Sequence, residues 1–330
     1  MTDVAAPELE RTLEQHRPEL TAHCYRMLGS SFEAEDAVQE TLVRAWRGFD
    51  NFEGRAALRS WLYRIATNVC LDMLQSRKRR ALPMDLGPSS SGDAEAGDRL
   101  PESMWLQPIP DRAAVPPNDD PAELASSRET IRVAFVAALQ HLPPRQRAVL
   151  ILREVLRWKA SEVAELLDTS VASVNSALQR ARSTLAESNV TDSDPFQPGD
   201  EAQQALLTRY VEAFERFDIE SLVSLLHEDA TMTMPPYDLW LQGADELRKW
   251  LLGAGAGCRG SRFAPVQANG SPAFAQWRPS ETGSGFDAWA IHVLQVSDGR
   301  ISGIDFFVDP DLFPLFGLPV RLDEHAGAHR

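Results

Sequence analysis

The side chains best suited to contact a ligand lie on one face of a predicted helix near residues 170–185. Their types change along the helix, from short hydroxyl and amide groups to longer donors and cations: Ser170, Ser173, Asn175, Ser176, Gln179, Arg180 and Arg182. Short polar groups suit base edges in the major groove, and arginines further along suit phosphates. The pattern indicates a helix that reads duplex DNA. The alternative is an ordinary helix pair with a solvated face.

Two helical patterns that meet at a tight turn position these side chains. In the second pattern, apolar residues recur at steps of three and four, which is the spacing of one helix face: Val171, Val174, Leu178, Ala181 and Leu185. Ser170 is predicted to cap this helix at its N-terminus. Asp168 is predicted to take the positive φ of the turn, which Asp tolerates better than most residues. The spacing therefore predicts a helix-turn-helix over 159–185.

Two earlier predicted helices carry a second set of residues that could contact a partner or nucleic acid. The helix predicted near 33–47 places Val38, Leu42, Ala45 and Trp46 on an apolar face, and its opposite polar face alone would suggest only solvation. The helix that begins near Leu58 follows a loop with Phe49 and Phe52 and combines aromatic rings with cations. Single-stranded nucleic acid needs rings for stacking and charges along its backbone. The alternative for Trp61 and the phenylalanines is a place in the core.

The net charge of −15 hides an uneven distribution. Residues 53–80 carry a net charge of +5 and residues 142–186 carry +3, whereas residues 81–130 carry −7 and residues 187–330 carry −12. The positive charge thus lies in the two segments that resemble nucleic-acid readers, so the charge of the whole chain is a poor guide to its partners.

Residues 81–127 are rich in Pro, Gly, Ser and acid, which predicts an extended linker. An apolar island at 104–110 (MWLQPIP) interrupts it and is expected to dock on a folded domain, with chance as the alternative. After a second linker, helical patterns come first and alternating strands follow, at 261–268, 273–278, 286–296 and 300–308, with Asp298-Gly299 predicted as the hairpin turn of the last pair. The last part of the chain is therefore predicted to be an α+β domain.

Other classes of function are not favoured. Cys24, Cys70 and Cys258 are widely spaced, form no metal or redox motif and fit a reducing cytoplasm. No apolar run is long enough to span a membrane, and the N-terminal residues lack the pattern of a signal peptide. We expect a cytoplasmic protein with no metal site and no cofactor.

Four motifs, taken in order, resemble the extracytoplasmic-function sigma factors of bacterial RNA polymerase: EDAVQETLVRAW, RSWLYRIATN, LPPRQRAVLILREV and SEVAELLDTSVASVNSALQRAR. Residues 200–325 are similar to the SnoaL-like, ketosteroid-isomerase-like cone fold. The resemblance implies a multidomain chain: an all-α sigma region 2 domain at 1–80, the acidic linker at 81–127, an all-α region 4 domain with the helix-turn-helix at 128–187, a linker at 188–199 and an α+β SnoaL-like domain at 200–330.

The resemblance also implies a role for each candidate face. Residues implied to bind the β′ clamp helices of core RNA polymerase are Asp36, Gln39, Glu40, Arg44 and Arg47. Residues implied to capture an unstacked base of the −10 promoter element are Asn51, Arg55, Arg59, Trp61, Tyr63, Arg64 and Asn68. The helix from Ser170 to Arg182 is implied to enter the major groove at −35. The chain departs from the family pattern in its longer linker, in Asp168 where Gly is usual and in its C-terminal domain.

The function that follows is promoter recognition and transcription initiation, with no enzymatic activity and with the C-terminal domain regulating the sigma domains. The expected partners are core RNA polymerase and promoter DNA, with an anti-sigma factor or a small ligand as further candidates. No interaction with a membrane is expected. Groups expected near the cavity of the cone are Tyr237, Trp240, His292 and Asp305, although His292 also fits a satisfied core histidine. The alternatives are a small-molecule-binding or isomerase-like cone fused to a DNA-binding module and, less favoured, a repressor or activator that binds duplex DNA alone.

Overall fold

The computed structural model describes residues 6–52, 57–75, 79–117, 120–187, 194–197 and 199–323. The chain forms two compact units. A helical unit contains residues 1–80 and 111–190, and a mixed unit contains residues 81–110 and 191–330. Each unit is therefore built from two separate stretches of sequence.

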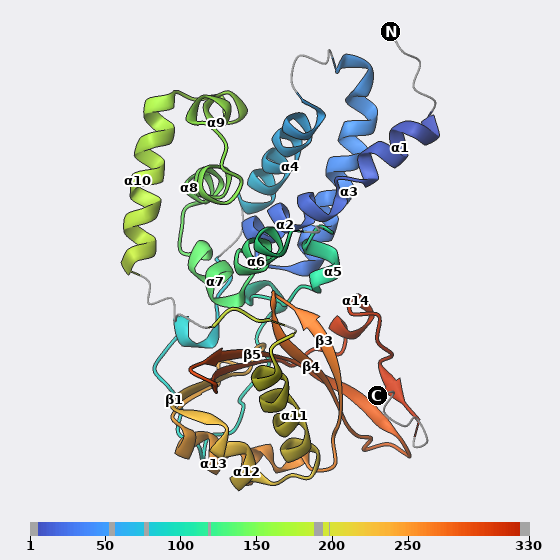
Figure 1. Cartoon of the computed structure of the whole chain (residues 1–330), viewed down its shortest axis with the longest axis vertical. Helices are drawn as coiled ribbons and strands as arrows, with labels where there is room; N and C mark the ends of the chain where they lie inside the picture. Colours follow the sequence, from blue (N-terminus) through green and yellow to red (C-terminus); the bar gives the residue numbers. More distant parts are fainter. Residues whose placement is uncertain are drawn as a thin grey trace. The chain divides into compact units, whose positions relative to one another are not determined.

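The described part of the helical unit contains helices of very different length (Figure 1). Their bounds are α1 (Ala6–Glu14), α2 (Arg17–Leu28), α3 (Ser31–Gly48), α4 (Leu58–Leu74), α5 (Asp111–Ala114), α6 (Pro121–Glu129), α7 (Val133–Gln140), α8 (Pro144–Leu150), α9 (Ala160–Leu166) and α10 (Val171–Glu187). Local signals explain several boundaries. Gly29 ends α2 with φ 71°, and the Ser30 side chain caps α3 by accepting a hydrogen bond from the Glu33 amide at 3.2 Å. Pro144 opens α8, where its missing N–H costs nothing.

The mixed unit combines the helices α11 (Glu201–Glu215), α12 (Ile219–Ser224), α13 (Ala244–Leu252) and α14 (Leu312–Leu315) with the strands β1 (Leu226–Thr233), β2 (Trp240–Gln242), β3 (Arg262–Ala268), β4 (Ser271–Pro279), β5 (Phe286–Ser297), β6 (Arg300–Phe307) and β7 (Arg321–Leu322). Within the described residues the strands form one seven-stranded sheet in the order β2-β1-β6-β5-β4-β3, with β7 also paired to β5. Strands β1 and β6 are parallel and the other pairs are antiparallel. The predicted α+β class is confirmed.

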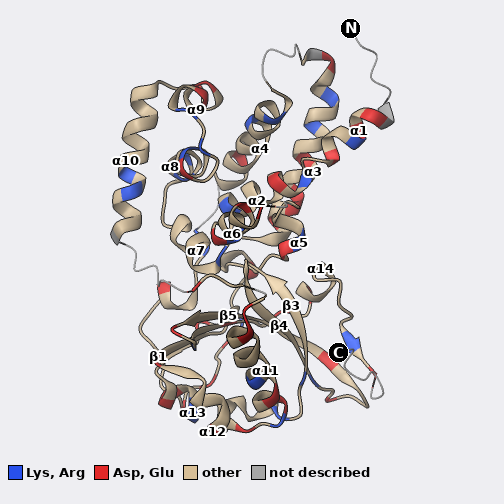
Figure 2. Ribbon diagram, in the orientation of Figure 1, with Lys and Arg blue, Asp and Glu red and all other residues tan. Residues whose placement is uncertain are grey.

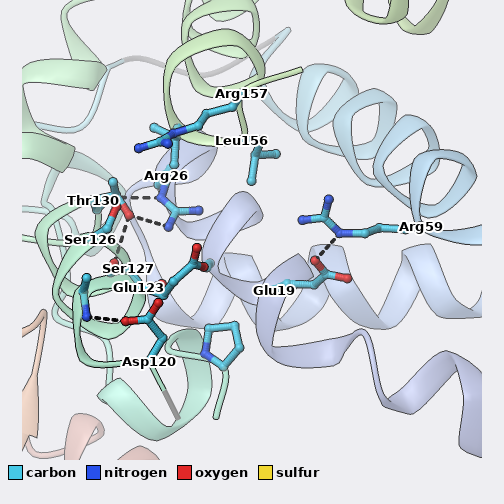
Figure 3. A pocket seen from close by; sticks show the side chains of 14 residues that line it. Glu19, Arg26, Arg59, Asp120, Glu123, Ser126, Ser127, Thr130, Leu156 and Arg157 are labelled. Atoms are coloured by element: carbon cyan, nitrogen blue, oxygen red, sulfur yellow. Dashed lines mark hydrogen bonds and ion pairs between the residues drawn. The ribbon is translucent and has the colours of Figure 1, made fainter. Parts of the chain in front are cut away.

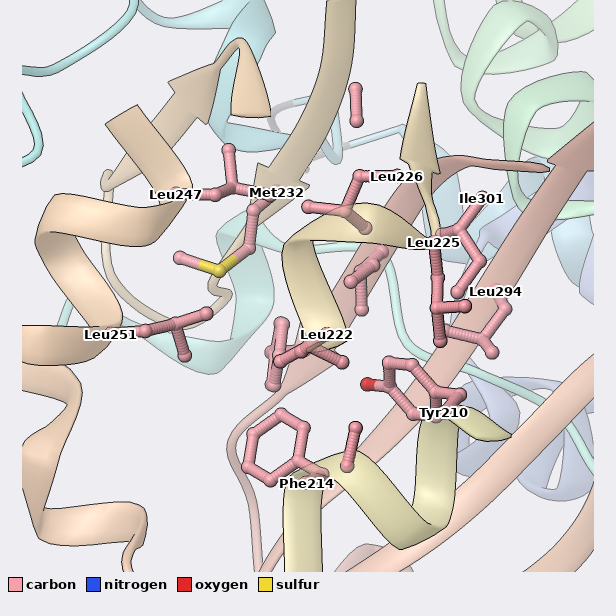
Figure 4. Close-up of a cluster of buried hydrophobic side chains, with 14 of the residues drawn as sticks. Tyr210, Phe214, Leu222, Leu225, Leu226, Met232, Leu247, Leu251, Leu294 and Ile301 are labelled. Carbon is pink, nitrogen blue, oxygen red and sulfur yellow. The ribbon is translucent and has the colours of Figure 1, made fainter. Parts of the chain in front are cut away.

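The core of the mixed unit lies between the helices and one face of the sheet. Leucine and aromatic side chains of α11, α12 and α13 fill this space together with residues of β1, β5 and β6, among them Met232 of β1 (Figure 4). Asp298 and Gly299 form the β5–β6 turn with φ values of 51° and 70°. Positive φ at both positions is typical of a two-residue hairpin turn, so that prediction is also confirmed.

The predicted linker at 81–127 is not one extended segment. Residues 81–110 belong to the mixed unit, where Trp105 and Leu106 are each 2% exposed, so the expectation that the apolar island docks is confirmed. Residues 111–127 instead belong to the helical unit and contain α5 and most of α6. Asp120 caps α6 by accepting a hydrogen bond from the Ala122 amide at 2.9 Å, with Pro121 in the first turn. This helix-start signal outweighs the acidic composition that suggested a linker.

Candidate functional site

The helix-turn-helix pattern forms as predicted. Asp168 takes φ 50° in the turn between α9 and α10, and the Ser170 hydroxyl accepts a hydrogen bond from the Ser173 amide at 3.1 Å. Val174, Leu178 and Ala181 are buried against the rest of the unit. Positive φ at Asp168 turns the chain sharply, so that α10 packs on its apolar stripe and turns its polar face outward.

The polar face of α10 is exposed along its whole length, from Ser173, Asn175 and Ser176 to Gln179, Arg180 and Arg182. Figure 2 shows basic residues, which are arginines in this helix, in the middle of α10. Arg182 forms an ion pair with Glu154 at 2.7 Å. Val171, which was predicted to face inward, is 44% exposed, so the buried stripe of α10 begins at Val174. The face presents the predicted order of short polar groups and then cations.

The candidate face of α4 is only partly available. Asn68 is exposed, and Arg59 lies over the Tyr63 ring and forms an ion pair with Glu19 at 2.6 Å. Arg64 forms an ion pair with Glu165 of α9 at 3.1 Å. Arg59, Arg64 and Asn68 are therefore not equally free to contact a partner.

Tyr63 is not on the exposed face, which corrects the prediction. It is 1% exposed, its hydroxyl lies 3.2 Å from a Glu19 carboxylate oxygen, and its ring packs against His23 and Trp158. Burial raises the pKa of the phenol. Trp158 comes from the segment before α9, so this contact between distant parts of the sequence could not be read from the periodicity of α4.

An aromatic cluster precedes α4. Trp61 is partly buried and packs on Phe52 and Phe49, with ring centroids 5.1 and 6.5 Å away. This arrangement agrees with the alternative that these rings stabilise the fold. The side chain of Asn51 and the whole of Arg55 lie outside the described residues.

The candidate face of α3 is exposed at all five predicted positions: Asp36, Gln39, Glu40, Arg44 and Arg47. Beside this face lies a groove of about 520 Å³ between α3 and α1. Trp46 and Val43 line the groove and are 43% and 38% exposed, although Trp46 was predicted to face inward. Sequence reasoning missed this apolar surface because Trp46 falls at the edge of the stripe of Val38 and Leu42.

The four candidate groups in the mixed unit do not form one site. His292 faces the apolar core, whereas Asp305 is in register with Val293, the neighbour of His292 on β5. Side chains of successive strand residues point to opposite faces, so His292 and Asp305 cannot act as a pair. Tyr237 packs against the core cluster, and the Trp240 indole donates to the Gly87 carbonyl at 2.9 Å. The predicted cluster around a cavity is therefore wrong.

His292 is fully satisfied by hydrogen bonds. Gln276 donates through its amide nitrogen to Ser261 at 2.8 Å, which turns the Gln276 carbonyl oxygen to His292 Nε2 at 2.7 Å. Nε2 therefore carries the proton, and Nδ1 accepts from the Tyr210 hydroxyl at 2.8 Å. Burial lowers the pKa of His292 to about 3, so the ring is neutral. Asp305 likewise accepts from Thr233 at 2.7 Å and from Gln295 at 3.1 Å, and burial raises its pKa.

Neither a metal site nor a membrane span is found in the described part of the chain. No three His, Cys, Asp or Glu side chains gather there in a way that could hold a metal ion. No described helix is both long enough and apolar enough to cross a bilayer.

Comparison with known proteins matches three family models to the chain: Sigma-70 region 2 at residues 12–80, Sigma-70 region 4 at 132–185 and a SnoaL-like domain at 207–304. The ECF RNA polymerase sigma factor SigG of Mycobacterium tuberculosis is 47% identical over 313 residues, which are 94% of this chain and 83% of that protein. The chain belongs to the extracytoplasmic-function sigma factors. The predicted family and function class are thus confirmed.

A second relative aligns with nearly the whole chain. The sigma factor SigJ of Mycobacterium tuberculosis is 27% identical and covers 96% of this chain. The crystal structure of SigJ matches with a TM-score of 0.57, at 24% identity over 96% of this chain and 100% of that one. The predicted fold, in which helical sigma domains are followed by a SnoaL-like domain, is therefore confirmed. We refer below to α1–α4 as region 2, to α7–α10 as region 4 and to residues 201–323 as the SnoaL-like domain.

Proposed function

We propose that this sigma factor binds the β′ clamp helices of core RNA polymerase through α3, reads the −35 element with α10 and captures −10 bases with α4. The exposed polar face of α10 and its Ser170 cap support the −35 assignment. The five exposed polar residues of α3, next to the groove lined by Trp46, support the polymerase assignment. Because polymerase transcribes the chromosome, the cytoplasm is the proposed place of action.

The SnoaL-like domain regulates this activity by holding the acidic segment 81–110, which connects region 2 to α5. The observation that carries this proposal is the depth of the docking. Trp105, Leu106 and Ile109 are buried, and Ile109 and Asn269 exchange two hydrogen bonds of 3.0 Å each. The resemblance implies that this segment threads through polymerase near the RNA path. A segment held on the SnoaL-like domain is not free to take that route.

The domain acts by binding and not by catalysis. A general base needs a free lone pair within reach of substrate, and both nitrogens of His292 are engaged within the core. Asp305 points to the other face of the sheet, with both oxygens engaged. These observations support the regulatory function over the isomerase-like alternative.

Asn269→Gly tests the proposal. Asn269 has φ 55°, which Gly adopts without strain, so the change removes the side chain and leaves the turn intact. The buried Ile109 amide then loses its acceptor, at a cost of about 1–3 kcal/mol, and the segment is released more often. Transcription from a cognate promoter with core polymerase should rise several-fold. Asp298→Gly is the control, because it removes a side chain at another positive-φ turn. Equal output from both variants and the wild type would contradict the regulatory proposal.

A further inference from the structure

A cavity in the helical unit is built around a buried arginine. We infer that it binds a small phosphate monoester, with the phosphate held by Arg26 and Arg157 and the rest of the molecule held by α6. The cavity has a volume of about 510 Å³ and lies between α2, α4, α6 and residues 155–157 (Figure 3). Pockets for small molecules usually measure about 300–1,000 Å³, so this one has room for more than a phosphate ion.

Arg26 of α2 carries a buried charge that no acidic side chain neutralises. It is 5% exposed, and its guanidinium donates from Nε to the Thr130 carbonyl at 3.1 Å and from Nη2 to the Thr130 hydroxyl at 2.6 Å. Neither acceptor is charged, and no carboxylate among the described residues forms an ion pair with Arg26. Burial lowers the pKa of Arg26 to about 10, so the side chain is still charged at neutral pH. Buried charges in proteins are normally paired, and a bound anion would pair this one.

The third nitrogen of Arg26 faces the cavity. Because Thr130 engages Nε and Nη2, Nη1 is left without a hydrogen-bond partner in the part of the chain that the structure describes. Figure 3 shows this nitrogen on the side of the guanidinium that points away from Thr130 and toward the cavity. The Thr130 hydroxyl is itself fixed, since it donates to the Ser127 carbonyl at 2.9 Å. The guanidinium is therefore held in one direction before any ligand arrives, which lowers the entropy cost of binding.

Arg157 supplies a second cation from another part of the chain. It has φ 57°, a conformation that a residue other than glycine adopts only at a cost in free energy. In Figure 3 its side chain extends to the side of the cavity where Arg26 lies, and no described residue pairs with its guanidinium. Arg59, a third arginine on the wall, is instead neutralised by Glu19 at 2.6 Å. Two guanidinium groups without an acidic partner match the double charge of a phosphate monoester better than the single charge of a carboxylate.

Helix α6 offers polar groups for the rest of the ligand. Glu123, Ser126 and Ser127 line the cavity, and the side chains of these three residues form no hydrogen bond or ion pair with a described residue. Asp120 also lines the wall, but its carboxylate caps α6. A hydroxyl can donate or accept a hydrogen bond, whereas the Glu123 carboxylate accepts hydrogen bonds and repels a bare anion. The ligand class is therefore a phosphate monoester that also carries amino or hydroxyl groups, such as an amino sugar phosphate.

Titration calorimetry of the full chain with inorganic phosphate, glucosamine and glucosamine 6-phosphate tests the site. The wild type should bind glucosamine 6-phosphate with a Kd below about 1 mM, inorganic phosphate more weakly and glucosamine not measurably. Arg157→Gln should weaken binding of glucosamine 6-phosphate about three- to tenfold, because one charged contact with the phosphate is lost. Arg145→Gln is the matched control, because it removes the same charge from an exposed arginine that does not line the cavity, and it should leave the affinity unchanged.

Two further variants assign the two walls of the cavity. Glu123→Gln should strengthen binding of inorganic phosphate and reduce the preference for glucosamine 6-phosphate, because it removes both a repulsion and an acceptor for the amine. Arg26→Lys keeps the charge but cannot hold Thr130 and a phosphate together, so it should abolish binding of both phosphates. If this buried change prevents folding, Arg157→Gln decides the test.

Hydrogen exchange locates the ligand. Saturating glucosamine 6-phosphate should slow the exchange of amides at residues 123–130 in the wild type, because a ligand that binds the folded state suppresses local opening. The inference would be overturned by a wild type that does not bind glucosamine 6-phosphate, by equal affinities of Arg157→Gln and Arg145→Gln, or by binding that leaves the exchange of residues 123–130 unchanged.

Discussion

Replacing Gly92 by valine would push the acidic segment off the SnoaL-like domain. A Cβ atom at Gly92 would lie 2.8 Å from the Lys249 Cβ and would overlap the Glu246 backbone carbonyl of α13. Neither obstacle is the far end of a flexible side chain, so the segment must move. Gly92 has no positive φ, and the effect of the change is therefore steric and not conformational.

The hydrogen bonds around Gly92 indicate how much free energy of docking the segment loses in Gly92→Val. Around this position the Gly92 amide donates to the Glu246 carboxylate at 2.6 Å, the Ser90 amide donates to the Trp240 carbonyl at 2.7 Å and the Trp240 indole donates to Gly87. At about 0.5–1.5 kcal/mol for each hydrogen bond, displacement costs roughly 2–4 kcal/mol. Trp105 and Ile109 keep the other end docked, so the change frees residues near 87–100 and leaves the fold intact.

Hydrogen exchange of the full chain measures this release. In Gly92→Val, the amides of residues 90–100 should exchange about 30- to 1,000-fold faster, and trypsin should cleave faster after Arg99. Gly87→Val is the matched control, because a Cβ at Gly87 meets nothing within 4 Å and its φ is ordinary. Equal protection of residues 90–100 in the two variants would refute the steric argument. Faster exchange with unchanged promoter output would support the docking of the acidic segment but refute its regulatory role.

Three further predictions concern the other sites. Arg180→Ala should weaken promoter binding and reduce the slope of log affinity against log salt by about 0.9, whereas an unchanged slope would exclude a phosphate contact. Trp46→Ala should weaken binding to core polymerase about tenfold or more in a pull-down titration, and unchanged affinity would exclude the groove. The folded pKa of His292, about 3, lies below its unfolded value of about 6.5, so protonation favours the unfolded state as pH falls through this window. Between pH 7 and pH 5 the free energy of unfolding should fall by about 2 kcal/mol more in the wild type than in His292→Gln, as measured by urea unfolding.

Local signals explain what the sequence could predict. Asp168 in the turn, Ser170 as a cap and Asp298-Gly299 as a hairpin turn each depend on neighbours within a few residues. The exposed face of α10 follows from the same local periodicity, because a helix that buries one stripe exposes the opposite one. These features could be predicted because no distant contact overrides them.

Long-range contacts explain what the sequence could not predict. The burial of Tyr63 depends on Trp158, almost one hundred residues away, and the ion pair of Arg64 depends on Glu165. The opposite orientation of His292 and Asp305 depends on the pairing register of β5 and β6, where a shift of one residue would reverse a side chain. Helix periodicity carries no information about such partners. The candidate residues on α4 could therefore be found from the sequence, but the distant residues that engage Tyr63 and Arg64 could not.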